Sequence, residues 1–227
     1  MASRRRWSAS STAASASFPR LVDVLFDIDG TLVRSYPHED ELYDRALQSV
    51  GLALPTTDYH ALGASTDVSI LRVLAQRAWK RDPTDAEIEQ VRSVHTRGWE
   101  SRLERSGIEV MPGARDVLSE LRARGARFAA ATGGFRVTAT TKLAAAALSI
   151  EVVAAAEDGL DRPELLARAA GDARPVYVGD GLWDAAAAAS NGLDFIGVAE
   201  SEERARAFRE RGCRVVSALA GVLDLLE

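Results

Sequence analysis

The stretch LVDVLFDIDGT, residues 21–31, is the strongest indication of the fold in this chain of 227 residues. Its first part is a short, mostly apolar run with β-branched residues, and a turn-forming Asp-Gly-Thr follows, so we predict a buried strand that ends in a loop. Segments of helical character separate several further runs of the same kind, and this alternation predicts an α/β fold with a doubly wound parallel sheet. These runs are RFAAA (127–131), EVVAA (151–155), PVYV (175–178) and DFIGV (194–198).

Two stretches depart from the alternation of strands and helices. Residues 34–111 are charged, of helical character and without a convincing strand, so we predict an inserted helical subdomain. Within it, Thr84–Glu87 (TDAE) fits a capping box at the start of a helix. Residues 1–20 are rich in Ser and Ala and contain no acidic side chain. We expect an unstructured leader there, with a short organellar targeting peptide as the alternative, and an α/β core formed by residues 21–33 and 112–227.

The composition excludes several classes of protein. The chain carries 28 basic and 33 acidic side chains, for a formal net charge of −5. Because nucleic acids require clustered Lys and Arg, and no basic block lies beyond the first six residues, we expect no nucleic-acid partner. The alanine-rich runs at 143–150 and 185–189 are shorter than the roughly 20 residues that span a bilayer, so we expect no membrane partner. Cys213 is the only cysteine, as is typical of cytoplasmic proteins.

Two pairs of acidic residues follow predicted strands. Asp27 and Asp29 come directly after the first strand, at the edge where parallel sheets bind ligands. Two carboxylates this close repel each other, a divalent cation relieves the repulsion, and oxygen ligands select Mg²⁺. Asp180 and Asp184 follow the strand at 175–178, and their spacing puts them one helical turn apart. We therefore predict that both pairs face one magnesium ion.

A third strand end carries a candidate phosphate site. Thr132, Gly133 and Gly134 follow the strand at 127–131, and a hydroxyl next to glycine amides can bind an anion. Each of the three polar segments follows a predicted strand. We expect all three to converge on one edge of the sheet.

DIDGT after an apolar strand, then ATGG, then YVGDGLWD resemble, in order, spacing and strand context, three of the four motifs of the haloacid dehalogenase-like hydrolases. The resemblance covers residues 21 to about 200 and is closest to the phosphatase branch with a helical C1-type cap, which includes phosphoglycolate phosphatases and β-phosphoglucomutases. It implies a Rossmann-like core and identifies residues 34–111 as the cap. The joint occurrence of three motifs is much more specific than any one of them.

The resemblance also implies a role for each matching residue. Asp27 would be the nucleophile that forms an aspartyl-phosphate, and Asp29 the general acid and base. Mg²⁺ would be held by the Asp27 carboxylate, the Asp29 backbone carbonyl and Asp180, with Asp184 holding metal-bound waters. Thr132 and the Gly133 amide would bind the transferred phosphoryl group.

The fourth motif of the family, a lysine ahead of the last acidic pair, has no direct match. Arg162, directly before Pro163, occupies that place and keeps the positive charge, although arginine is bulkier and planar. Lys142 is the alternative, although its position fits the motif less well. We favour Arg162 as the third phosphate-binding residue.

Other polar residues are assigned to packing and capping. His38, His60 and His95 are scattered without the spacing of metal ligands, so we expect them at the surface or packed within the cap. Asp67 and Ser69 are expected to cap a helix, and the alternative is a place on a cap loop that faces the site. No role in a reaction is predicted for any of the five.

The predicted function is a Mg²⁺-dependent phosphomonoesterase that acts on a small phosphorylated metabolite. The family's dehalogenases lack the residue that matches Asp29, which disfavours carbon–halogen chemistry. One alternative is a sugar-phosphate mutase of the same family, although mutases usually carry an arginine where this chain has Thr66. The other alternative is a catalytically idle binding protein, suggested by Arg162. The identity of the substrate and the choice between monomer and dimer stay open.

Overall fold

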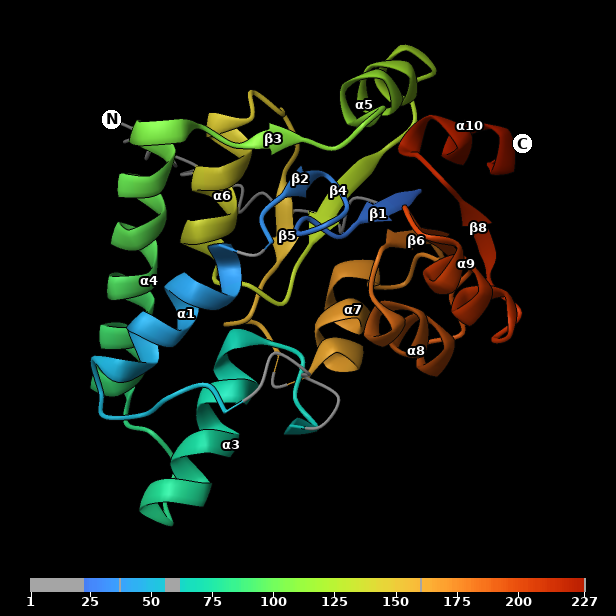
Figure 1. Cartoon of the computed structure of the whole chain (residues 1–227). Helices are drawn as coiled ribbons and strands as arrows, with labels where there is room; N and C mark the ends of the chain where they lie inside the picture. The colour runs from blue at the N-terminus through green and yellow to red at the C-terminus, as the bar shows by residue number, and fades with distance from the viewer. Residues whose placement is uncertain (1–22, 37, 56–61, 160, 227) are drawn as a thin grey trace, which may run out of the picture.

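The computed structural model describes residues 23–36, 38–55, 62–159 and 161–226. Within them, six parallel strands form one sheet in the order β5-β4-β1-β6-β7-β8 (Figure 1). Counted along the chain this order is 3-2-1-4-5-6, which is a doubly wound arrangement, so the predicted α/β fold is confirmed. The strands are β1 (Val24–Phe26), β4 (Phe128–Ala131), β5 (Val152–Ala154), β6 (Val176–Gly179), β7 (Phe195–Val198) and β8 (Arg214–Val216).

Helices cover both faces of the sheet. Successive side chains of a strand point to opposite faces, and accordingly Val24 and Phe26 belong to one buried cluster while Leu25 belongs to another. The first cluster includes residues of α5 (Ala114–Ala123), α6 (Arg136–Ala145) and α10 (Val222–Leu225). The second includes residues of α7 (Arg162–Ala170), α8 (Leu182–Ser190) and α9 (Glu202–Arg209). An apolar β1 is therefore required because this central strand is buried on both sides.

Three short strands, β8, β3 (Glu109–Val110) and β2 (Val33–Arg34), differ from the sequence-based prediction. The edge strand β8 was not predicted, because it has three residues and follows the charged stretch Arg209–Cys213. The span predicted to lack strands contains β3, which pairs antiparallel with β2. The pairing places Val33 opposite Val110, so the chain leaves the α/β core and returns to it through one two-stranded ribbon.

In the described part of the span between β2 and β3 there are three helices: α1 (His38–Gln48), α3 (Asp67–Trp79) and α4 (Asp85–Ser106). Figure 1 shows them grouped at one side of the sheet, away from α9 and α10. The predicted capping box of α4 is confirmed, since the Thr84 hydroxyl accepts from the Glu87 amide and the Glu87 carboxylate accepts from the Thr84 amide. Across the described ranges, no helix combines the length and the apolar character needed to cross a membrane.

Candidate active site

The predicted motifs meet at the carboxyl ends of three neighbouring strands. Asp27 follows β1, Thr132 follows β4, and Asp180 follows β6, and β1 lies between the other two in the sheet. The order of strands reverses between β1 and β6, which is where doubly wound sheets bind ligands. Residues from this edge and from the inserted helices line one pocket: Asp27, Asp29, Tyr36, Glu39, Tyr43, Ser65, Asp67, Ile70, Thr132, Gly133, Arg162 and Trp183.

Three carboxylates form an acidic cluster beside this pocket, and two of them, Asp27 and Asp184, are buried. Asp27, Asp180 and Asp184 each offer an oxygen atom within 4.8 Å of the others. Burial raises the pKa of all three carboxyl groups, and the neighbouring charge of Asp184 adds to the effect at Asp27 and at Asp180, whose pKa reaches about 7. Oxygen ligands that converge with an excess of negative charge fit a hard divalent cation.

Backbone and hydroxyl groups hold two members of the acidic cluster. Asp180 accepts a hydrogen bond from the Thr31 hydroxyl at 3.1 Å. Asp184 accepts from the Tyr177 hydroxyl at 2.9 Å and from the Gly181 amide at 3.0 Å. Both oxygens of Asp184 are therefore engaged by the protein, which fits a residue that supports the metal site from behind.

Gly30 allows the close approach of the two acidic motifs. Its φ is +83°, a left-handed conformation that side chains rarely adopt. A Cβ atom at this position would also collide with the Asp180 carboxylate. The glycine of the first motif is therefore needed both for the turn and for the space that Asp180 occupies.

The two candidate cations, Arg162 and Lys142, contact different carboxylates. Arg162, the first residue of α7, places Nη1 2.9 Å from Oδ1 of Asp27 and 3.4 Å from Oδ1 of Asp184. Lys142, from the last turn of α6, instead places Nζ 2.5 Å from Oδ1 of Asp29. Arg162 thus lies against the predicted nucleophile, and Lys142 lies against the predicted acid and base.

The Thr-Gly-Gly segment after β4 is packed against the inserted helices. The Thr132 hydroxyl accepts from the Gly134 amide at 3.1 Å, and the Gly133 carbonyl accepts from the Asp67 amide at 2.8 Å. A Cβ atom on Gly133 would collide with the Ser65 carbonyl and lie 2.8 Å from Nη2 of Arg162. Glycine is therefore required here because the segment before α3 and Arg162 both approach the backbone closely.

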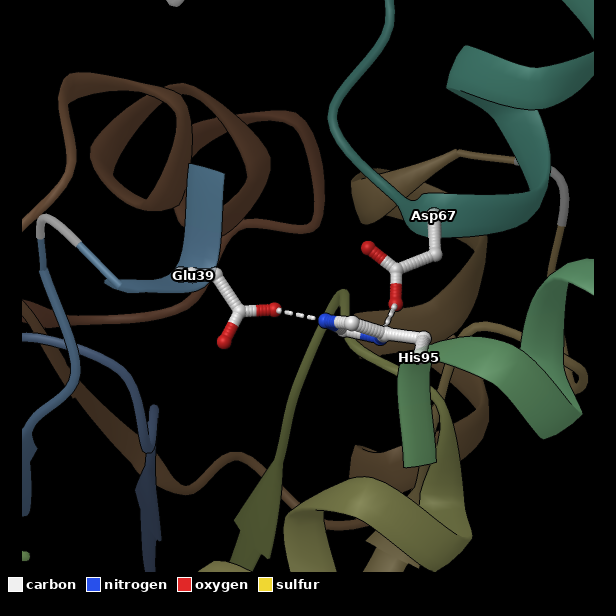
Figure 2. A group of neighbouring side chains, drawn as sticks. All are labelled: Glu39, Asp67 and His95. Atoms are coloured by element: carbon white, nitrogen blue, oxygen red, sulfur yellow. Dashed lines mark ion pairs between the residues drawn. The ribbon is translucent and has the colours of Figure 1, made fainter. Parts of the chain in front are cut away.

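A second buried cluster of charges was not predicted from the sequence. Glu39 of α1, Asp67 of α3 and His95 of α4 offer ligand atoms within 4.8 Å of one another. Figure 2 shows the His95 ring lying between the two carboxylates, with Nε2 3.2 Å from Glu39 Oε1 and Nδ1 3.9 Å from Asp67 Oδ2. Because the two carboxylates approach different nitrogens of the ring, the three side chains do not converge on a single point as metal ligands do.

Lys142 joins this cluster from the core. Its Nζ lies 2.8 Å from Glu39 Oε2 and 4.8 Å from the centre of the Trp99 ring. Burial alone would lower the pKa of Lys142, but Asp29 and Glu39 outweigh it and raise the pKa above its usual value. Lys142 therefore carries a full charge between the core and the inserted helices.

His95 is packed within the inserted helices, as predicted, but the charged cluster around it was not predicted. His95 is fully buried, four residues after Val91 and four before Trp99, so a polar residue within an apolar stripe was the available signal for the cluster. His38 contacts Arg102 at 2.9 Å, whereas His60 lies outside the described residues. His38 takes no part in the cluster.

The capping prediction is right for one of its two residues. Ser69 belongs to the capping box of α3, which begins after Thr66. Asp67 does not cap its own helix, because its carboxylate instead accepts from the Phe135 amide at the start of α6, at 2.9 Å. Burial raises the pKa of Asp67 to about 7. The hydrogen bond between Asp67 and the Phe135 amide therefore connects α3 to the start of α6 in the core.

Comparisons with known proteins agree with this geometry. A family model described as haloacid dehalogenase-like hydrolase matches residues 24–192. A hydrolase from Pseudomonas syringae is 25% identical, with a TM-score of 0.68 over 90% of this chain and 97% of that one. The putative β-phosphoglucomutase from Bacteroides vulgatus is 20% identical, with a TM-score of 0.67 over 91% and 88%. CbbY from Rhodobacter sphaeroides in complex with phosphate is 20% identical, with a TM-score of 0.66 over 89% and 96%. The search of curated proteins gives no match.

Proposed function

The chain belongs to the haloacid dehalogenase-like hydrolase family, and we propose that it is a Mg²⁺-dependent phosphomonoesterase that acts on a small phosphorylated metabolite. One observation carries the proposal: Asp27 is paired with Arg162 inside an acidic cluster and lines the same pocket as Asp29 and Thr132. This arrangement provides a nucleophile, an acid and base, and groups that bind phosphate, all facing one space.

We propose a reaction in two displacements. A carboxylate oxygen of Asp27 attacks phosphorus, the bond between phosphorus and the alcohol oxygen breaks, and Asp29 gives its proton to that oxygen. Water then attacks the phosphorus of the aspartyl-phosphate, Asp29 takes the proton back, and inorganic phosphate leaves with the Asp27 carboxylate restored. Arg162, Thr132 and the Gly133 amide would bind the phosphoryl oxygens throughout.

The acidic cluster fits a divalent cation, and we propose that the cation is Mg²⁺. Asp27, Asp180 and the backbone carbonyl of Asp29 would hold it, with Asp184 supporting the site through water. When bound, Mg²⁺ would supply positive charge that offsets the negative charge of the transferred phosphoryl group. CbbY of Rhodobacter sphaeroides, which shares the fold, was crystallised with phosphate, in keeping with a phosphate ligand for this pocket.

We propose that residues 34–111 act as a cap that encloses the substrate. α1 and α3 contribute Glu39, Asp67 and Ile70 to the pocket, while the α/β core contributes the phosphate-binding groups. An enclosed site excludes water from the phosphoryl transfer and selects the substrate by the shape of the cap.

One observation favours the phosphatase over the mutase. A mutase must bind a second phosphate, yet Arg162 is the only Arg or Lys among the described residues that line the pocket. Thr66, at the place where mutases usually carry an arginine, is buried and caps α3. Within the part of the chain that the structure describes, the pocket therefore offers Arg162 beside the nucleophile and no second Arg or Lys for another phosphate.

The experiment is phosphate release from a panel of small phosphomonoesters, with and without Mg²⁺. We expect turnover that EDTA abolishes and that Asp27→Asn lowers on the order of 10⁴-fold or more, because the nucleophile is lost. Arg162→Lys keeps the charge but not the forked geometry, so it should retain part of the turnover. If no ester is turned over in the presence of Mg²⁺, the phosphatase proposal is wrong, and mutase assays followed by a search for binding partners come next.

A further inference from the structure

Five charged side chains form a continuous chain from the core through the inserted helices. In order they are Asp29, Lys142, Glu39, His95 and Asp67, and the sign of the charge alternates along the chain when His95 is protonated. The last member returns to the core, where the Asp67 carboxylate accepts from the Phe135 amide. The chain therefore connects α1, α3 and α4 to the carboxylate proposed as the acid and base.

Lys142 is the member that joins the two parts of the protein. It is 1% exposed and lies 2.5 Å from Asp29 and 2.8 Å from Glu39. Trp99 closes the space around it, because its ring lies beside Nζ and its Nε1 donates to Glu39 Oε2 at 3.0 Å. This packing fixes the position of the Lys142 ammonium group. Its two carboxylate partners, Asp29 and Glu39, are bound strongly because a buried charge needs partners of opposite sign.

The contact with Lys142 determines which oxygen of Asp29 faces the phosphate site. Nζ binds Oδ1 of Asp29. The other oxygen, Oδ2, lies on the side of Gly134, where a Cβ atom would be 3.7 Å from Oδ2 and 3.5 Å from the Thr132 hydroxyl. Oδ2 is therefore the oxygen of Asp29 that lies beside the phosphate-binding segment.

We propose that Lys142 is a positioning residue for Asp29, held in place by Glu39 and Trp99 of the inserted helices. This inference rests on the proposed function. In this arrangement each cation of the site contacts a different aspartate: Arg162 contacts Asp27, the proposed nucleophile, and Lys142 contacts Asp29, the proposed acid and base. Lys142 acts through Asp29 and makes no contact with the substrate, since Asp29 and Glu39 line the pocket and Lys142 does not.

The test compares two substrates that differ in how much the leaving oxygen needs a proton. Benzyl phosphate and p-nitrophenyl phosphate are similar in size, but only the benzyl alkoxide leaves poorly without protonation. We expect Lys142→Met to lower kcat/KM for benzyl phosphate on the order of 10²-fold, the usual contribution of a general acid, and for p-nitrophenyl phosphate by less than about tenfold. An equal loss for both esters would overturn the proposal, because damage to the fold or to phosphate binding affects both alike.

Two further variants control for simple loss of structure. Lys80→Met removes the other lysine of the chain, which is exposed at the end of α3, and should leave both values of kcat/KM unchanged. Glu39→Gln keeps a hydrogen-bond acceptor for Lys142 but removes one charge. It should lower kcat/KM for benzyl phosphate more than for p-nitrophenyl phosphate, so the inference stays testable even if Lys142→Met fails to fold. An equal effect of Glu39→Gln on the two esters would contradict it.

Crystal structures of the wild type and the Lys142→Met variant decide the positioning without any turnover. In the wild type, Oδ1 of Asp29 should bind Nζ of Lys142, and in the variant the Asp29 carboxylate should turn away from this orientation. An unchanged carboxylate in the variant would overturn the inference even if the enzyme is a phosphatase. Conversely, a wild type that hydrolyses neither ester would refute the phosphatase proposal, whereas the two structures still report whether Lys142 orients Asp29.

Discussion

The two sides of the pocket hold similar numbers of buried charges but differ in their balance. The sheet-edge cluster, made of Asp27, Asp180, Asp184 and Arg162, has three carboxylates and one cation. We call the other group the helical chain. It consists of the five charged side chains Asp29, Lys142, Glu39, His95 and Asp67, of which three are carboxylates and two carry positive charge. The charges of the helical chain therefore nearly balance, whereas the sheet-edge cluster has two more carboxylates than cations. The excess of carboxylates marks the side on which a divalent cation is expected to bind.

The largest expected effect comes from removing the one cation of the sheet-edge cluster. Arg162→Met leaves Asp27 and Asp184 buried without their partner, and breaking a buried ion pair in this way costs about 3–5 kcal/mol of the free energy of unfolding. Denaturant unfolding without metal ions measures the loss. Arg168→Met, at an exposed position of the same helix, is the matched control and should change the stability little. Equal losses for the two variants would show that the cluster does not depend on Arg162.

A smaller effect on stability is expected when a divalent cation binds to the sheet-edge cluster. Mg²⁺ at 100 times its dissociation constant should raise the free energy of unfolding by about 2.7 kcal/mol, because it binds only the folded state. Asp180→Asn should remove this stabilisation, whereas Asp172→Asn, at an exposed position, should keep it. Thermal unfolding with and without Mg²⁺ measures both. If Mg²⁺ stabilises the Asp180→Asn variant as much as the wild type, the cation binds elsewhere.

The smallest effect concerns the pH dependence of the helical chain. Burial lowers the pKa of His95, and so does the positive charge of Lys142. The carboxylates of Glu39 and Asp67 raise the pKa by more, so that it lies above its usual value. Tyr43 also packs against the ring. Because the folded state raises this pKa, protonated His95 stabilises the fold fully below its usual pKa, and this contribution is lost as the pH rises through the raised value.

His95→Gln tests this direction. The difference in unfolding free energy between the wild type and the variant should be largest in mild acid and should shrink as the pH rises. Denaturant unfolding at a series of pH values measures this difference. A difference that stays constant with pH would mean that the charge of His95 contributes nothing to stability.

The sheet-edge cluster could be anticipated from the sequence, and the helical chain could not. Asp27, Thr132 and Asp180 each follow a strand, and parallel strands bring their carboxyl ends to one edge, so local patterns were enough to predict that these residues meet. The partners of Lys142 lie on helices that are distant in the sequence, and helical periodicity indicates which face is buried but not which other helix packs against it. For the same reason the sequence left the choice between Arg162 and Lys142 open.

The sequence by itself therefore determined the α/β fold, the family and the residues placed at the sheet edge, because each depends on short runs of neighbouring residues. Only the tertiary structure decided that Arg162 binds Asp27 and Lys142 binds Asp29. It also decided that Glu39, His95 and Asp67 meet in one buried chain. The physical reason is that a buried charge must find a partner of opposite sign wherever packing brings one near, and packing is a property of the whole fold.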